Sequence, residues 1–282
     1  MKNRVKKPYV FAFDLDGTLL QSNNKAHIDT IKALKKSKEH GHINVIATGR
    51  GITKTLPLLD SKAVDHIDYL VCSNGTAVYD IKNQKAYILN SLDKDIFYIM
   101  RDIASKHQLI ITVDTHNYNA TALPNNQKPH WITDANIMDM NIINQISIEK
   151  MQEVIENKDV QIVQIALRNP LKSAKEITDL TKKLLKDFEC NIYLTNSIYT
   201  DVNPINTSKL IGLEYLLNLL NLTTKNLVTF GDSGNDIDMT KHASLGIAMG
   251  NATADLKDVA AHIINDHNSA TIGEFITSFL AE

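Results

Sequence analysis

The sequence contains few cysteines, glycines and prolines. Its 282 residues include two cysteines, Cys72 and Cys190, which are too few for a disulfide framework or a cysteine-rich zinc site. The 11 glycines and 6 prolines, together with 43% hydrophobic and 22% charged residues, exclude a disordered or fibrous chain. We therefore expect a folded protein of the reducing cytoplasm.

The chain also lacks an excess of charge and any long hydrophobic run. It has 30 Lys and Arg against 32 Asp and Glu, a formal net charge of -2, so no overall positive field attracts nucleic acid or anionic lipid. The first apolar run, residues 9–13, ends at Asp14 and is too short for the hydrophobic part of a signal peptide. No stretch approaches the roughly 18 apolar residues of a membrane span. We expect neither nucleic acid nor a membrane as a partner.

Both ends of the chain alternate short apolar runs with longer amphipathic stretches. This alternation is typical of strands and helices in a parallel α/β sheet. Gly41 follows the first amphipathic stretch, where a helix commonly ends at a residue that tolerates positive φ. The pattern predicts strands at 10–13, 43–47, 69–72, 227–230 and 245–249, and helices at 27–40, 52–59, 209–220, 236–242 and 272–280.

The middle of the chain has a different pattern, in which hairpin-like strands are interleaved with helices. We interpret it as an inserted α+β domain with a largely antiparallel sheet. The predicted division is a core of residues 1–80 and 203–282 and an insert of residues 81–202. Within the insert, strands are predicted at 85–89, 110–113, 160–167, 191–194 and 198–202, and helices at 93–107, 148–157 and 173–188.

Three apolar strands of the predicted core end directly in small or acidic polar residues. Ligands of open parallel sheets bind outside the carboxyl ends of the strands, so these three ends should meet at one place. Clustered carboxylates repel one another unless a cation neutralises them, and an all-oxygen set suits Mg²⁺. The sequence therefore predicts a magnesium and phosphate site formed by Asp14, Asp16, Thr48, Asp232 and Asp236.

Each of these residues also has an ordinary structural interpretation. Asp14 can cap a turn, and Thr48 can cap the helix that follows it. Lys209 can be a solvated charge at a helix start, and Asp232 and Asp236 can be caps where a loop enters a helix. Capping alone does not explain why so many carboxylates gather beside glycines.

Taken together, the motifs resemble those of the haloacid dehalogenase superfamily, in their expected order. The matching segments are residues 14–20 (DLDGTLL), 48–50 (TGR), 73–75 (SNG), Lys209 and 231–239 (GDSGNDIDM). Residues 246–252 (GIAMGNA) are typical of its Cof-like branch, whose members are mostly phosphatases of sugar phosphates and other small phosphate esters. The resemblance implies a Rossmann-like parallel-sheet core with an inserted α+β cap of the C2B type.

The resemblance also implies the chemistry at the end of the first strand. Asp14 would be the nucleophile that forms an aspartyl-phosphate, and Asp16 the general acid and base. The metal would be Mg²⁺, bound by Asp14, Asp232 and the backbone carbonyl of Asp16. Asp236 would be an outer-sphere ligand or would orient Lys209.

The remaining motifs would hold the substrate. Thr48, the Gly49 amide and Asn235 would contact the phosphoryl oxygens, and Lys209 would neutralise charge that develops on them. Arg50 either reaches the substrate or braces its loop. The family motif usually has glycine after the lysine, where this chain has Leu210.

These observations predict a Mg²⁺-dependent phosphatase that hydrolyses a small phosphorylated metabolite, most readily a sugar phosphate. One alternative is phosphoryl transfer to a second hydroxyl, as in the related phosphomannomutases. Another is a sensor that binds phosphorylated ligands without turnover. The motifs identify neither the leaving group nor the oligomeric state.

Overall fold

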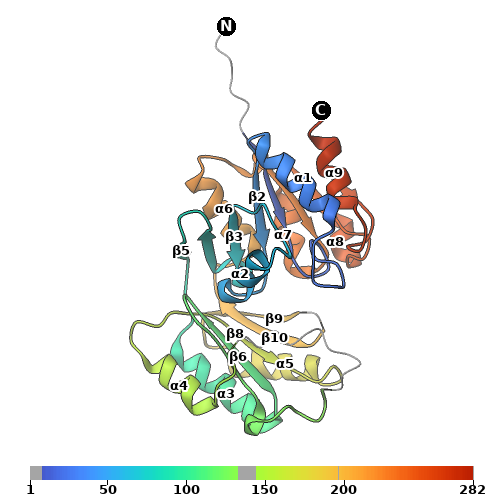
Figure 1. Ribbon diagram of the computed structural model, residues 1–282. Coiled ribbons are helices and arrows are strands. Elements are labelled where there is room, and N and C mark those ends of the chain that lie inside the picture. The colour runs from blue at the N-terminus through green and yellow to red at the C-terminus, as the bar shows by residue number, and fades with distance from the viewer. Residues whose placement is uncertain (1–7, 133–143, 196, 282) are drawn as a thin grey trace. The chain divides into compact units, whose positions relative to one another are not determined.

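The chain divides into two compact units, which are shown in the ribbon diagram of the computed structural model (Figure 1). The structure describes residues 8–132, 144–195 and 197–281. Within them, unit 1 comprises residues 8–50, 55–87 and 208–281, and unit 2 comprises the remainder. Residues 1–7, 133–143, 196 and 282, which belong to the predicted core and insert, lie outside the described residues.

Unit 1 contains an eight-stranded sheet with the order β13-β12-β11-β1-β2-β3-β4-β5. The pairs from β13 to β3 are parallel, and β4 runs antiparallel to β3. The predicted parallel α/β fold class is therefore confirmed. The strands are β1 (Val10–Phe13), β2 (Ile43–Ala47), β3 (Tyr69–Cys72), β4 (Ala77–Asp80), β5 (Lys85–Ile88), β11 (Leu227–Gly231), β12 (Leu245–Ala248) and β13 (His262–Ile263).

The assignment of β5 differs from the sequence prediction, which placed residues 85–89 in the insert. The structure places this strand at the edge of the unit 1 sheet, next to β4. Its four residues are exposed or half-buried, so their pattern is typical of an edge strand in either unit and does not reveal the sheet to which they belong.

The central strand β1 is fully buried, because all four of its residues are apolar and lie between helices on the sheet. Gly41 follows the end of the first helix with φ of +79°, as the sequence predicts. Helix α1 packs against α9, and α6 packs against α7. The helices of this sheet are α1 (Ile28–Glu39), α2 (Ile52–Asp60), α6 (Lys209–Leu219), α7 (Ile237–His242), α8 (Ala254–Val259) and α9 (Thr271–Phe279).

Unit 2 contains an antiparallel five-stranded sheet with the order β7-β6-β8-β10-β9. The helices of unit 2 pack along one face of this sheet (Figure 1). The strands are β6 (Ile110–Thr115), β7 (Asn119–Ala122), β8 (Ile162–Arg168), β9 (Cys190–Thr195) and β10 (Tyr199–Pro204), and the helices are α3 (Lys94–His107), α4 (Ile148–Glu156) and α5 (Ala174–Leu184).

The core of unit 2 lies between this sheet and its helices. Phe97 and Met100 of α3 are fully buried there, together with Ile165, Leu167 and Val202 from the sheet.

None of the helices in the described ranges is long and apolar enough to cross a membrane.

We expect Phe97→Ala to lower the free energy of unfolding by about 3–5 kcal/mol, because it leaves a cavity in the core of unit 2. Urea denaturation followed by circular dichroism measures the change. Leu184→Ala, at a side chain that is 47% exposed, is the control and should change the value by less than about 0.5 kcal/mol. Equal effects of the two substitutions would contradict the assignment of this core.

Candidate active site

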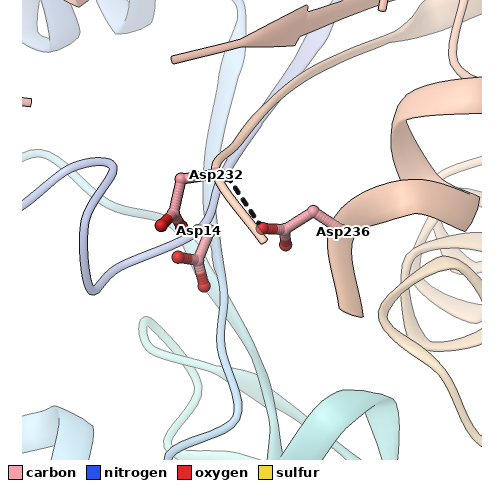
Figure 2. Close-up of side chains that lie close together, drawn as sticks. All are labelled: Asp14, Asp232 and Asp236. Carbon is pink, nitrogen blue, oxygen red and sulfur yellow. Dashed lines mark hydrogen bonds between the residues drawn. The ribbon is translucent and has the colours of Figure 1, made fainter. Parts of the chain in front are cut away.

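Three aspartates lie together at the carboxyl ends of two adjacent parallel strands. Asp14 follows β1, Asp232 follows β11, and Asp236 ends the short 3-10 turn Gly234–Asp236. One carboxylate oxygen of each lies within 4.8 Å of the other two. Figure 2 shows the three side chains, with the hydrogen bond that links the Asp232 backbone to Asp236. The structure thus brings together three of the carboxylates that the sequence predicts to converge.

The loop after β1 is shaped by a close approach to Asp232. Gly17 has φ of +80°, and a Cβ added to it would lie 2.6 Å from Oδ2 of Asp232. Only glycine satisfies both constraints without strain. The next residue, Thr18, donates a hydrogen bond from Oγ1 to Oδ1 of Asp232 at 3.2 Å. The glycine therefore permits the contact that positions Asp232 beside Asp14.

Lys209 links two of the three carboxylates. Its Nζ donates to Oδ1 of Asp14 at 2.5 Å and to Oδ1 of Asp236 at 2.7 Å. The residue is only 1% exposed, so its interpretation as a solvated charge is wrong. Lys209 is the first residue of α6, and the Ser208 side chain caps this helix by accepting a hydrogen bond from the Ile211 amide.

The electrostatics of the cluster follow from burial and mutual repulsion. Burial raises the pKa of Asp14 well above its usual value, although the charge of Lys209 lowers it, and Asp236 and Asp232 raise it further. Burial and the charge of Asp236 raise the pKa of Asp232 to about 6. Burial alone would lower the pKa of Lys209, but Asp14 and Asp236 outweigh it, so this pKa is raised and the ammonium remains charged. One lysine does not fully compensate three carboxylates.

Asp236 also shapes its own loop. Its second oxygen, Oδ2, accepts hydrogen bonds from the backbone amides of Asp232 and Ser233, both at 3.0 Å. Ser233 and Asp236 form a capping box, so the capping interpretation of Asp236 is correct alongside its contact with Lys209. Asp238, in contrast, is exposed.

Asp16 lies in a different charge environment. Arg50 donates from Nε to Oδ2 of Asp16 at 2.8 Å and from Nη2 to Oδ1 at 2.5 Å. The side chain of Asp16 is not among the carboxylates that gather at Asp14 in the described chain. Of the two interpretations of Arg50, the contact that the structure contains is the brace on Asp16. Sequence reasoning missed this pair, because nothing in the spacing of 34 residues indicates it.

The other predicted phosphate contacts lie around Asn74, a residue that the sequence prediction left without a role. Oδ1 of Asn74 accepts from Nδ2 of Asn235 at 3.0 Å, and a Cβ on Gly49 would lie 3.3 Å from it. Oγ1 of Thr48 accepts from the Arg50 amide at 3.1 Å. Helix α2 begins only at Ile52, so the alternative interpretation of Thr48 as the cap of this helix is wrong. Asn74 lies just after the end of β3, and this position is the sequence feature that could have identified it as a site residue.

The donor set suits a hard divalent cation. Three carboxylates supply only oxygen atoms, and the one ammonium in contact with them balances only part of their negative charge. Burial is the first cause of the raised pKa values of Asp14 and Asp232, and a cation bound here would offset both the burial and the mutual repulsion of the carboxylates.

Comparison with known proteins shows matches over nearly the whole chain. The family model described as haloacid dehalogenase-like hydrolase matches residues 11–276. A 5-amino-6-(5-phospho-D-ribitylamino)uracil phosphatase of Bacillus subtilis, YcsE, is 28% identical over 90% of this chain and 88% of its own. The pyridoxal phosphate phosphatase YbhA of Escherichia coli is 25% identical over 96% of this chain and 98% of its own. A solved structure, the HAD subclass IIB sugar phosphatase BT4131, has a TM-score of 0.77 at 22% identity, covering 97% of this chain and 100% of that one.

We expect millimolar Mg²⁺ to raise the melting temperature, because a cation stabilises the folded state that binds it. Asp232→Asn should abolish most of this shift. The exposed Asp238→Asn is the matched control and should keep it. Differential scanning fluorimetry measures all three proteins. An equal Mg²⁺ response in wild type and Asp232→Asn would contradict a cation site at this cluster.

The Mg²⁺ response should weaken as the pH falls through about 6, the pKa to which burial and Asp236 raise Asp232. A protonated carboxyl binds the cation poorly. Without the cation, the pH dependence of stability runs in the opposite direction. The Asp232 carboxyl holds its proton more tightly in the folded state than in the unfolded state, so its contribution to stability falls as the pH rises from about 4 to 6. Melting curves across this range, with and without Mg²⁺, test both pH dependences. A Mg²⁺ shift that is constant across the range would contradict the assignment.

Proposed function

This chain belongs to the haloacid dehalogenase-like hydrolases, and from that premise we propose that it is a Mg²⁺-dependent phosphatase of small phosphorylated metabolites. Sugar phosphates are the substrates we favour, and the reaction proceeds through an aspartyl-phosphate on Asp14. The observation that carries the proposal is the buried Lys209, which contacts Asp14 and Asp236 at the ends of parallel strands. Each relative named above is a phosphatase of a small phosphorylated compound, which supports this substrate class.

In the first step, a carboxylate oxygen of Asp14 attacks the phosphorus atom, and the ester P–O bond breaks. The leaving oxygen takes a proton from Asp16, and the phosphoryl group remains on Asp14. In the second step, a water oxygen attacks the same phosphorus atom and its proton returns to Asp16. The acyl–phosphate P–O bond breaks, which releases phosphate and regenerates the Asp14 carboxylate.

The hydrogen bond from Lys209 supports this role of Asp14. Its charge favours the ionised carboxylate, which is the form that attacks phosphorus, against the opposing effect of burial. Asp236 keeps the ammonium in place, because it accepts from Lys209 with one oxygen and from the loop amides with the other.

Asp16 has a separate task and a separate partner. The two hydrogen bonds from Arg50 fix the orientation of its carboxyl group, so Arg50 acts as a positioning residue. Thr48, the Gly49 amide and Asn235 hold the phosphoryl oxygens in this proposal.

The proposed metal ligands are Asp14, Asp232 and the backbone carbonyl of Asp16, with Asp236 in an outer position. A Mg²⁺ ion bound by them would supply positive charge that stabilises the phosphoryl oxygens during transfer. The inserted domain, predicted as residues 81–202, selects the leaving group in this account.

We expect Asp14→Asn to abolish Mg²⁺-dependent hydrolysis of p-nitrophenyl phosphate, because an amide is a poor nucleophile. The substitution removes one charge without changing the shape of the side chain, so the circular dichroism spectrum should remain that of the wild type. Asp238→Asn is the control and should retain wild-type turnover. Wild-type activity in Asp14→Asn would contradict the proposed mechanism.

The same assay separates the two alternative functions. A phosphatase releases one inorganic phosphate for each alcohol formed, whereas a phosphoryl transferase leaves the phosphate on an acceptor. Addition of a hexose acceptor should therefore leave the ratio of phosphate to nitrophenol unchanged. A sensor would bind the ester without any turnover.

A further inference from the structure

The segment after β12, residues 249–253, contacts two loops that carry proposed metal ligands. The Thr253 amide donates to the carbonyl oxygen of Asp232 at 2.9 Å. Asn251, two residues earlier, donates from Nδ2 to the carbonyl oxygen of Gly17 at 2.9 Å. Gly17 lies in the loop after β1, and Asp232 lies in the loop after β11. All of these residues belong to unit 1, so one short segment of this unit holds both loops.

The orientation of the Asn251 amide is determined by its two partners. Nδ2 donates to the Gly17 carbonyl, and Oδ1 accepts from the backbone amide of His267 at 3.1 Å. A backbone carbonyl only accepts and a backbone amide only donates, so a reversed side-chain amide would lose both hydrogen bonds. The side chain thus connects the loop after β1 with the loop after β13.

The backbone that carries Asn251 is well packed, although the side chain itself is exposed. The next residue, Ala252, lies in a small apolar cluster with Ala248 and Leu256. The position of the asparagine is therefore set by the core of unit 1. Substitution of an exposed residue usually changes stability little, so we do not expect the fold to depend on this side chain.

Gly17 is the position in the loop after β1 where a restraint has the greatest effect. Its φ of +80° lies in the left-handed region, and glycine rotates about its backbone bonds more freely than other residues. Rotation there would move the backbone carbonyl of Asp16, a proposed metal ligand, relative to Thr18. The Thr18 hydroxyl donates to Asp232, which is another proposed ligand. A hydrogen bond to the Gly17 carbonyl opposes this rotation.

We propose that Asn251 is a positioning residue for the cation site, which keeps the Asp16 carbonyl and the Asp232 carboxylate in place through its hydrogen bond to Gly17. The inference rests on the proposed Mg²⁺-dependent function and adds a residue that acts through the loop instead of binding the substrate. Groups that orient metal ligands in this way commonly contribute about tenfold or more to metal affinity or activity.

Titration with Mg²⁺ tests the proposal without turnover, because the rise in melting temperature with Mg²⁺ concentration gives the dissociation constant of the ion. Asn251→Ala removes both hydrogen bonds and should raise this constant by about tenfold. Asn83→Ala is the matched control, since Nδ2 of this exposed asparagine donates to Oδ2 of Asp80 at 2.7 Å in the turn between β4 and β5. The control should keep the wild-type constant. Without Mg²⁺, both variants should melt close to the wild type.

A second variant separates the two hydrogen bonds of Asn251. Asn251→Asp retains an acceptor for the His267 amide and loses the donor to the Gly17 carbonyl. It should bind Mg²⁺ more weakly than the wild type, even though its added negative charge favours a cation. Mg²⁺ binding as tight as that of the wild type would overturn the role of the Gly17 hydrogen bond.

Hydrolysis of p-nitrophenyl phosphate by the wild type separates this inference from the function on which it rests. If the wild type binds Mg²⁺ and does not hydrolyse the ester, the proposed function fails, and the titration still decides the role of Asn251. If the wild type hydrolyses it and Asn251→Ala keeps the wild-type dissociation constant for Mg²⁺, the role of Asn251 is overturned and the phosphatase function stands. A wild type that binds no Mg²⁺ overturns both.

Discussion

The arrangement of the site depends on one interaction, the burial of the Lys209 ammonium between Asp14 and Asp236. Removing either partner from a buried ion pair commonly costs several kcal/mol, so the three side chains hold one another in place. Asp14 at the end of β1 lies 195 residues before Lys209 at the start of α6, and Asp236, in the turn before α7, lies 27 residues after Lys209. The contact therefore fixes the geometry in which the two ends of the chain meet. The register of β1 against β11 places Asp14 and Asp232 at the same edge of the sheet, and Lys209 supplies the charge that lets carboxylates gather there.

The same arrangement separates the two acidic roles. Asp14 lies in a buried cluster whose negative charge one lysine balances only in part, which favours binding of a cation and of a phosphoryl group beside it. Asp16 follows two residues later, but its carboxyl group is held by Arg50 outside that cluster. Two aspartates on one short loop thus have different partners, and the proposed mechanism gives each of them a different role.

Much of the fold could be predicted, because β1, β2, β3 and β11 are short apolar runs that follow the rule for buried parallel strands. The elements missed include two strands without that signal, because β13 has two exposed residues and β7 consists of the small side chains NATA. Strand β4 and the short helix α8 were missed as well. The ends of strands likewise predicted that Asp14 and Asp232 lie together. The burial of Lys209, the pair of Asp16 with Arg50 and the contact of Asn74 with Asn235 depend on side-chain placement over 27 to 195 residues, which no local pattern encodes.

In the proposed mechanism, Asp14 carries the phosphoryl group during turnover. The most direct measurement is to quench the enzyme with acid while it hydrolyses a phosphate monoester, digest it and locate the phosphoryl group by mass spectrometry. The account predicts a phosphoryl group on the peptide that contains Asp14, attached to that side chain and removed by hydroxylamine, as expected for an acyl phosphate. A phosphoryl group attached to any other residue would contradict it.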